Sequence, residues 1–369
     1  MIRILHVVSS LNINAGMMSV VMNYYRRLDR NAIQFDFWYF NSIKDDYGAE
    51  IEALGGRAFY MPYRTFRPRD QKKIRAFFQE HRGEYAAVHC HPIWSSAVIS
   101  REAKRSGIKH VLQHLHSTHY SDKKTSEIRN RILMRFSGLY VTDYLACNSE
   151  AAALFGKRRA NNGTVFILPN AIEVGKYRFD RDLRDRMRAG FDADRSTLLI
   201  GNVGRLSPEK NQCFLVEIFQ RIREKRPDAK LIIVGDGSLR ETIENRSREL
   251  NLDGAVILTG RRRDIPAILS CLDLFLMPSL FEGTPVSAIE ARSAGLPCLL
   301  SDSITRSVEM EGVRFLSLKE SPEQWAEAAL RLWDEWKDHD RNDYGAVVDN
   351  GFDIRSEAFK LQEYYMKLG

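Results

Sequence analysis

The sequence predicts an α/β protein of two doubly wound domains, each a parallel sheet with helices on both faces. Short apolar, β-branched segments alternate with segments of helical period along the whole chain, as in successive βαβ units. The length of 369 residues is more than one hydrophobic core usually serves. A charged segment with little strand pattern interrupts the alternation near the middle of the chain. Together these observations indicate two sheets joined by a linker.

The strand-like segments fall into two groups. The first group has seven members, at 2–9, 35–41, 57–61, 86–91, 109–115, 144–148 and 164–168. The second group has six, at 197–204, 230–235, 255–259, 273–278, 297–301 and 313–317. The residues 171–196 separate the groups, and a short helix is expected there from Arg181 to Ala189. The tail from Ile354 to Leu368 has apolar residues at helical spacing, which predicts a terminal amphipathic helix.

The composition indicates a soluble globular protein, with 44% hydrophobic and 28% charged residues. No apolar run approaches the roughly 20 residues that cross a bilayer. The first eight residues form a strand pattern without the basic leader of an exported protein, so a cytoplasmic location is expected. The five cysteines are odd in number and lie mostly in apolar stretches, which predicts reduced thiols in the cores.

The positive charge is concentrated in the first half of the chain. Residues 1–170 hold 25 lysines and arginines against 14 acids, a balance of +11, which leaves −4 for the remainder. Two clusters hold most of it: Arg64, Arg67, Arg69, Lys72, Lys73 and Arg75, then Lys123, Lys124, Arg129, Arg131 and Arg135. The second cluster alternates with apolar residues. This pattern is typical of a helix that lies peripherally on an anionic membrane, and equally of a solvated helix face.

The loops that follow strands of the second half are the candidate ligand site, because open α/β sheets bind ligands beyond the carboxyl ends of their strands. One loop contains Glu282 and Gly283 and enters a helix, with Thr284 expected as N-cap and Pro285 as first helical residue. Amide groups at such a helix start attract anions. The carboxylates of Glu282 and Glu290 are suited to accept hydrogen bonds from sugar hydroxyls.

A second loop carries Arg205 and Lys210, two cations that could neutralise a diphosphate without a metal. We therefore predict metal-independent chemistry with no cofactor. The turn at Gly235 is half of a dinucleotide fingerprint and is weak evidence alone. Arg261 lies in a fourth loop that could meet a base, and Gly16 is the useful glycine of the first strand-to-helix loop.

Several histidines lie at strand ends of the first half. His114 and His116 alternate along one strand, so they share a face of the sheet, and His89 and His91 do so on another. A metal site is conceivable, but the spacing matches no known ligand pattern. We expect His116 to be a polar group at the ligand site instead.

The second half resembles the donor domain of glycosyltransferase family 4, which comprises retaining enzymes of GT-B architecture and includes bacterial capsular and exopolysaccharide glycosyltransferases. The resemblance rests on motifs in the family's order: Gly204-Arg205-Leu206 with Lys210-Asn211, Val234-Gly235-Asp236-Gly237, Phe281-Glu282-Gly283 through Glu290-Ala291, and Ala294-Gly295-Leu296-Pro297. Pro169-Asn170-Ala171 is similar to the family's interdomain Pro-Asn-Gly, with alanine in the place of glycine.

This resemblance implies two Rossmann-like domains that face each other across a cleft, with a C-terminal helix that crosses back to the first domain. The first, acceptor-side domain would comprise 1–170 plus 352–369, and the second, donor domain 171–351. The implied reaction is retaining transfer of a sugar from a nucleotide diphosphate, most simply a UDP-sugar, to a glycan or lipid-linked acceptor.

The resemblance also implies roles for single residues. Arg205 and Lys210 would bind the diphosphate and Glu290 the ribose, while Glu282 would contact the transferred sugar and His116 would face the reacting centre. The full expected set is His116, Glu282, Arg205 and Lys210 for catalysis, and Gly16, Gly204, Arg205, Lys210, Gly235, Arg261, Glu282, Gly283, Thr284 and Glu290 for donor binding. The family often has paired glycines in its first loop, whereas Ala15 precedes Gly16 here.

Other functions remain open at this point. A nucleotide-sugar epimerase or phosphorylase could share the architecture, as could a binding subunit without turnover. A metal-dependent transferase is disfavoured because the Asp-x-Asp pairs, at Asp180/Asp182, Asp192/Asp194 and Asp338/Asp340, do not follow strands. A dehydrogenase would need a complete glycine fingerprint. No nucleic-acid partner is expected, because the basic residues belong to no recognisable reading module.

Overall fold

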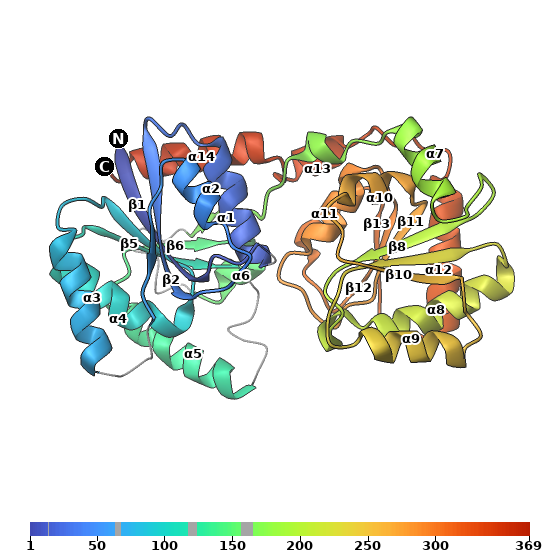
Figure 1. Ribbon diagram of the computed structural model, residues 1–369, viewed down its shortest axis with the longest axis horizontal. Helices are drawn as coiled ribbons and strands as arrows, with labels where there is room; N and C mark the ends of the chain where they lie inside the picture. Colours follow the sequence, from blue (N-terminus) through green and yellow to red (C-terminus); the bar gives the residue numbers. More distant parts are fainter. Residues whose placement is uncertain (14, 63–67, 117–123, 156–164) are drawn as a thin grey trace. The chain divides into compact units, whose positions relative to one another are not determined.

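The computed structural model describes residues 1–13, 15–62, 68–116, 124–155 and 165–369, and side chains of all of these except 124 and 125. The contacts divide the chain into two compact units, Met1–Ala171 with Ile354–Gly369 and Ile172–Asp353 (Figure 1). Three basic residues of the predicted clusters, Arg64, Arg67 and Lys123, lie outside the described residues.

The first unit is built on a seven-stranded parallel sheet of order β3-β2-β1-β4-β5-β6-β7. Its strands are β1 (Ile2–Ser10), β2 (Ile33–Asn41), β3 (Ala58–Tyr60), β4 (Ala87–Cys90), β5 (His110–Leu115), β6 (Asp143–Ala146) and β7 (Phe166–Ile167). Alternate side chains of β1 enter two separate cores, Leu5 and Val7 on one face and Ile4 and Val8 on the other.

Helices cover both faces of this sheet (Figure 1). One face is covered by α3 (Pro68–Glu80), α4 (Ile93–Arg105) and α5 (Lys124–Ser137), and the other by α1 (Gly16–Arg27), α2 (Gly48–Ala53) and α14 (Ile354–Met366). The short α6 (Ser149–Ala153) follows β6. The terminal helix α14 packs on α1 and buries Ala358, Leu361 and Tyr365. The last residues of the chain therefore complete the core that the first strand begins.

The second unit contains a six-stranded parallel sheet of order β10-β9-β8-β11-β12-β13. Its strands are β8 (Leu199–Val203), β9 (Lys230–Val234), β10 (Val256–Gly260), β11 (Leu274–Met277), β12 (Cys298–Ser301) and β13 (Val313–Leu316). The strands β8, β9 and β11 are neighbours in the sheet. The loops that follow them therefore meet at one edge.

Two layers of helices enclose the second sheet. One layer comprises α8 (Gln212–Lys225), α9 (Arg240–Glu249) and α12 (Pro322–Trp336). The other comprises α7 (Arg181–Ala189), α10 (Ile265–Cys271), α11 (Val286–Ser293) and α13 (Gly345–Asp349), with the 3₁₀ turn η1 (Val174–Tyr177). Two further 3₁₀ turns are η2 (Pro208–Lys210) and η3 (Arg306–Val308).

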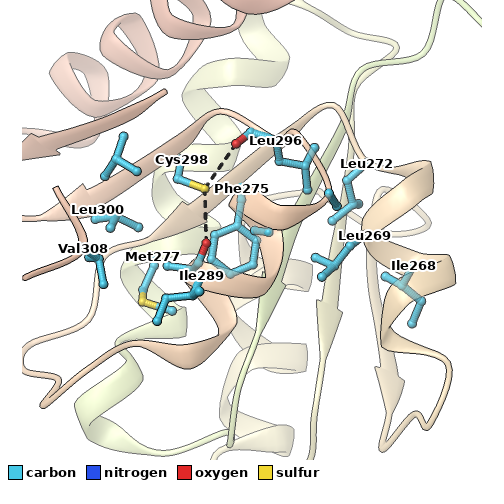
Figure 2. Packing of buried hydrophobic residues seen from close by; sticks show 14 of the residues in the cluster. Ile268, Leu269, Leu272, Phe275, Met277, Ile289, Leu296, Cys298, Leu300 and Val308 are labelled. Atoms are coloured by element: carbon cyan, nitrogen blue, oxygen red, sulfur yellow. Dashed lines mark hydrogen bonds between the residues drawn. The ribbon is translucent and has the colours of Figure 1, made fainter. Parts of the chain in front are cut away.

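The helix α11 is anchored by apolar packing on β11 and β12. Figure 2 shows Ile289 of α11 beside Phe275 and Cys298, and all three side chains are buried. The thiol of Cys298 lies 3.5 Å from the carbonyl oxygen of Leu296 and 4.0 Å from that of Ala288. This packing holds the start of α11, and the loop before it, against the edge of the sheet.

The predicted fold class is confirmed, and each of the thirteen expected strand ranges overlaps a strand of the structure. The helix expected from Arg181 to Ala189 is α7, and the expected terminal helix is α14. The predicted start of the helix after Glu282 is wrong by one residue: α11 begins at Val286, and Pro285 is the N-cap, because its ψ of 86° is not helical.

The five cysteines are all unpaired thiols, four of them buried and Cys213 half-buried. Within the part of the chain that the structure describes, no helix combines the length and apolar character that a membrane crossing needs.

Candidate functional site

Glycines bring the loops after β8 and β9 into direct backbone contact. The Gly204 amide donates to the Val234 carbonyl at 2.9 Å, and the Leu206 amide donates to the Asp236 carbonyl at 3.1 Å. Gly235 has φ of +140°, and a Cβ there would overlap the carbonyl oxygen of Gly204. Only glycine satisfies both conditions. The result is a compact rim of backbone at the edge of the sheet.

The basic residues of the second loop have different environments. Lys210 forms an ion pair with Glu282 through Nζ and Oε1, and both side chains are mostly buried. The stem of Lys210 passes over Gly204, where a Cβ would lie 3.4 Å from Cε. Arg205 is exposed, and its guanidinium bonds to none of the described residues, although its carbonyl accepts a bond from Gln212 at 2.8 Å. One cation is thus neutralised and the other is available to a ligand.

The second predicted carboxylate, Glu290, points to a different partner. The Tyr177 hydroxyl donates to Glu290 Oε1 at 2.6 Å. Burial raises the pKa of Glu290 to about 7, while this hydrogen bond and the charge of Lys176 act in the opposite direction. Burial also raises the pKa of Tyr177, so the phenol remains a donor. Glu290 is therefore poised to change its charge near neutral pH.

The remaining predicted donor residues lie in varied settings. Gly283 is half-buried and Thr284 is buried immediately before α11. Pro285 supplies no amide hydrogen, but it is the N-cap, so the first helical residue is Val286, which has an amide. Arg261 is exposed and lies 3.8 Å from the carboxylate of Asp236. Gly16 begins α1 in the other unit, and a Cβ there would meet no atom within 4 Å.

In the first unit, five histidines gather on the face of the sheet that α1 and α14 cover. His6 of β1 is paired in register with His89 of β4, and His91 follows two residues later. His114 and His116 come from the neighbouring strand β5 and its end. The ring centroids of these last two lie 3.9 Å apart. The cavity that all five line measures only about 10 Å³, so it admits no sugar.

The histidine rings contact one another through their nitrogens. His6 Nδ1 lies 3.0 Å from His91 Nε2, and His91 Nδ1 lies 2.7 Å from His116 Nε2. His89 Nδ1 lies 2.6 Å from the hydroxyl of Tyr365, on α14. Both nitrogens of His91 are therefore engaged with other rings.

Burial keeps these histidines neutral. It lowers the pKa of His6 to about 3 and that of His116 to about 4; His116 also lowers the pKa of His6, and Asp36 acts in the opposite direction. The pKa values of His89, His91 and His114 are also far below the usual value, first because of burial and then because of the adjacent rings. At pH 7 each ring has one N–H and one lone pair.

Two groups of three, His6/His89/His91 and His91/His114/His116, have ligand atoms near enough to consider a metal ion. In the first group, the rings of His89 and His91 are stacked at an interplanar angle of 15°, so their in-plane lone pairs lie in nearly parallel planes and do not converge on one ion. In either group, an ion bound to His91 would displace at least one of the two ring-to-ring contacts of that residue. The arrangement favours hydrogen bonds between the rings.

Three residues of these sites escaped the sequence analysis. Tyr177 lies in the segment between the two strand groups, and nothing in its neighbourhood indicated that its hydroxyl would meet Glu290. His6 is one polar residue in an apolar strand, and its place beside His89 depends on the strand order. Asn170 was noted only as part of a motif, yet its amide interacts with the ring of His116.

The second unit thus presents an exposed cation and an ion pair at the glycine-packed loops, and a carboxyl on α11 that a tyrosine holds. These groups suit an anionic ligand that also carries hydroxyls, as a nucleotide sugar does. Comparison with known proteins agrees with this class. Residues 197–335 match the family model described as glycosyl transferases group 1.

The relationship extends over most of the chain. The sequence is 34% identical over 342 residues to the putative glycosyltransferase EpsF of Bacillus subtilis (strain 168), covering 89% of this chain and 87% of the relative. It is 26% identical over 326 residues to the UDP-Gal:alpha-D-GlcNAc-diphosphoundecaprenol alpha-1,3-galactosyltransferase of Escherichia coli, covering 85% and 84%. The chain belongs to the group 1 glycosyltransferases, and the resemblance to family 4 is consistent with this.

Solved structures show the same fold. Anabaena Alr3699/HepE in complex with UDP superposes with a TM-score of 0.80 at 16% identity, with full coverage of both chains. Sucrose-phosphate synthase of Thermosynechococcus elongatus superposes with a TM-score of 0.79 at 16% identity, covering 100% of this chain and 99% of that one. The fold is therefore GT-B, with two Rossmann-like units.

Proposed function

We propose that this glycosyltransferase moves a sugar with retention of anomeric configuration from a UDP-sugar, without a metal, to a glycan or lipid-linked acceptor. The uridine donor is supported by relatives, because one is named for UDP-Gal and the Anabaena neighbour was solved with UDP and with UDP-glucose. The acceptor class is supported by the diphosphoundecaprenol acceptor in the first of these names. In this proposal residues 171–351 are the donor domain, and 1–170 with 352–369 the acceptor-side domain.

The observation that carries the proposal is the contrast between Arg205 and Lys210 on the glycine-packed rim. Arg205 is exposed and can bind the diphosphate directly. Lys210 is held by Glu282, so a phosphate that approaches Lys210 also comes beside a carboxylate suited to sugar hydroxyls. The pair thus marks the junction between the phosphate and sugar parts of the donor. That junction would be lined by Gly204, Gly235 and the backbone of Gly283 and Thr284.

The chemistry that we propose is electrostatic. Breaking the anomeric bond builds positive charge on the sugar and negative charge on the leaving diphosphate. Arg205 and Lys210 stabilise the leaving group, and Glu282 orients the sugar. Glu290 would accept hydrogen bonds from the ribose, and Arg261 would lie toward the base. Gly16 would lie near the phosphates, and His116 would act at the reacting centre.

The donor proposal can be tested by thermal melting in EDTA with UDP, UDP-sugars and other nucleotide diphosphates. We expect stabilisation by UDP and UDP-sugars, worth about 2.7 kcal/mol at a ligand concentration 100 times Kd. Glu290→Ala and Arg205→Ala should each remove most of it. Arg331→Ala makes the same change at an exposed position of α12 and should leave it intact. Equal stabilisation in all variants would place the nucleotide elsewhere.

The reaction class needs a separate measurement. We expect sugar transfer in EDTA, with the anomeric configuration of the product matching that of the donor by NMR. An epimerase would convert the UDP-sugar without any acceptor, whereas a transferase shows only slow hydrolysis there. Transfer that requires Mg²⁺ or Mn²⁺, or a product of inverted configuration, would refute the corresponding part of the proposal.

We further propose that α5 docks on an anionic membrane surface, from which a lipid-linked acceptor can be reached. Four apolar side chains follow one stripe of α5 and the residues after it and are more than half exposed: Ile128, Ile132, Phe136 and Leu139. Arg129, Arg131 and Arg135 are exposed beside them. An apolar stripe flanked by cations complements an anionic bilayer, where each cation contributes about 1 kcal/mol.

Vesicle sedimentation tests this docking. We expect binding to vesicles that contain phosphatidylglycerol, weak binding to pure phosphatidylcholine, and a decrease with added salt. The double variant Ile132→Ser/Phe136→Ser should bind at least about tenfold more weakly. Phe359→Ser removes an equally exposed aromatic ring from α14 and serves as the control. No preference for anionic vesicles would refute the docking and leave the donor site unaffected.

A further inference from the structure

The three rings of His6, His91 and His116 form a single hydrogen-bonded line across the first sheet. Their contacts join β1 to β4 at 3.0 Å and β4 to the end of β5 at 2.7 Å. Each contact joins two ring nitrogens, so each needs one proton between its atoms. Because the rings are neutral, the line has three protons, of which two fill the contacts and one lies at an end.

The third proton has two possible places. It lies on Nε2 of His6 or on Nδ1 of His116, and either choice fixes the tautomer of all three rings. Both atoms are buried and make no other hydrogen bond within the described part of the chain. The line therefore has two directions, and the surroundings of its ends decide between them.

The His6 end is poor in acceptors. Its ring packs against Phe35 at a centroid distance of 4.0 Å and against Phe37 at 5.5 Å. The nearby carboxylate of Asp36 is already occupied by Arg3, Arg57 and Tyr85. An N–H of His6 that points into this apolar setting would be a buried donor without a partner, which costs about 1–3 kcal/mol.

The His116 end has an acceptor at hand. The side chain of Asn170 lies beside the His116 ring and favours an N–H on it. Oδ1 of Asn170 and Nδ1 of His116 are both buried, and neither has a hydrogen-bond partner among the described residues. A proton on Nδ1 of His116 would therefore satisfy two buried polar atoms at once. A proton on His6 would leave both of them, and His6 itself, unsatisfied.

We propose that His6 and His91 are positioning residues that set His116 in the Nδ1–H tautomer. In this arrangement Nδ1–H of His6 donates to Nε2 of His91, and Nδ1–H of His91 donates to Nε2 of His116. This inference rests on the proposed role of His116 at the reacting centre. His116 then donates its Nδ1–H to Asn170 and accepts from His91 at Nε2, so neither ring nitrogen keeps a free lone pair. It does not act as a general base.

The tautomers can be measured directly by two-bond ¹H–¹⁵N correlation spectra of the ligand-free protein labelled with ¹⁵N in histidine. We expect one tautomer, Nδ1–H, for His6, His91 and His116. His91→Asn removes the middle ring, so the His116 signals should move toward an average of both tautomers. His339→Asn, an exposed histidine of the second unit, is the control and should change none of these signals.

Three outcomes would overturn the inference. They are an Nε2–H tautomer of His116 in the unaltered protein, unchanged His116 signals in a folded His91→Asn variant, and displacement of the ring protons by stoichiometric Zn²⁺, which would make the cluster a metal site. If His91→Asn does not fold, the spectrum of the unaltered protein decides alone.

Kinetics separate this inference from the proposed function. We expect His91→Asn to lower kcat of sugar transfer about tenfold with little change in the donor KM, because His116 remains but is no longer held in one tautomer. Failure of UDP-sugars to bind at all would refute the proposed function while the measured tautomers still stand. Unchanged kcat with altered tautomers would show that the line does not serve the reaction.

Discussion

The two acidic residues of the donor motif lie in opposite electrostatic settings. Glu282 faces the ammonium of Lys210, whereas Glu290 faces a neutral phenol in a buried setting. Burial raises the pKa of Glu290, whereas Glu282 is paired with the cation of Lys210. The same residue type, eight positions apart, therefore forms an ion pair in one place and a titrating acceptor in the other.

The raised pKa of Glu290 predicts a pH dependence of donor binding. In the proposed site, ribose hydroxyls would donate to the ionised carboxylate, so affinity should rise as the pH increases through about 7. For UDP-glucose, whose diphosphate does not titrate in this range, we expect binding about tenfold weaker at pH 6 than at pH 8 by calorimetry. Glu290→Gln should bind weakly at both values.

Tyr177→Phe is the matched test of this assignment. It removes the hydrogen bond that opposes the rise in the pKa of Glu290, so the transition should shift to higher pH. Binding of UDP-glucose that is independent of pH in the unaltered protein would contradict the assignment. So would a transition that persists in Glu290→Gln.

At the scale of elements, the rim of the second unit depends on loops that touch through their backbones. Gly235→Ala should combine an unfavourable φ of +140° with a collision against the Gly204 carbonyl. Gly254→Ala is the control, because its φ of +72° is also unfavourable but its Cβ would meet open space. We expect Gly235→Ala to cost roughly 1–3 kcal/mol more in urea unfolding, and to weaken UDP binding. Equal losses of unfolding free energy in the two variants would show that the backbone near residue 235 shifts to relieve the collision.

The terminal helix α14 makes another prediction at this scale. Leu361 is buried against the first sheet, whereas Phe359, on the same helix, is 60% exposed. Leu361→Ala should lower the free energy of unfolding by about 2–5 kcal/mol, and Phe359→Ala by less than about 0.5 kcal/mol. Similar small effects in urea melts would mean that α14 does not complete the core.

For the whole molecule, the histidines make the first unit sensitive to acid. Their pKa values in the folded protein are lowered from 6.5, so their contribution to stability is full above pH 6.5 and is lost as the pH falls toward about 4. Each histidine adds a slope of up to about 1.4 kcal/mol per pH unit. Glu290 acts in the opposite sense, because its raised pKa favours the folded state more as the pH falls from 7 toward 4.5.

We therefore expect the free energy of unfolding from urea melts to fall steeply between pH 6.5 and 4.5. His91→Asn should reduce the change in this free energy per pH unit by the contribution of one histidine, up to about 1.4 kcal/mol. The variant His339→Asn, at an exposed position, should not reduce it. A flat profile, or the same slope in both variants, would contradict the burial of neutral rings.

Much of the proposed donor site could be named from the sequence because its residues are close along the chain. Arg205 and Lys210 share one loop, and Glu282 and Glu290 share another loop and the helix that follows it. The ion pair between Lys210 and Glu282 was not predictable, since it joins loops that meet only because β8 and β11 are neighbours in the sheet. The N-cap of α11 was predicted one residue early, because composition does not determine ψ at Pro285.

Alternation of apolar segments was sufficient, in this protein, to predict two parallel α/β sheets and to place every strand, since burial on both faces requires continuous apolar runs. Only the tertiary structure decided which strands are neighbours. That order brings His6, His91 and His116 into one line and Tyr177 onto Glu290, with 85 residues of sequence between His6 and His91 and 113 between Tyr177 and Glu290. Contacts between distant residues depend on the order of strands in the sheet and on which face each side chain enters. Neither can be deduced from the residues next to each strand in a single sequence.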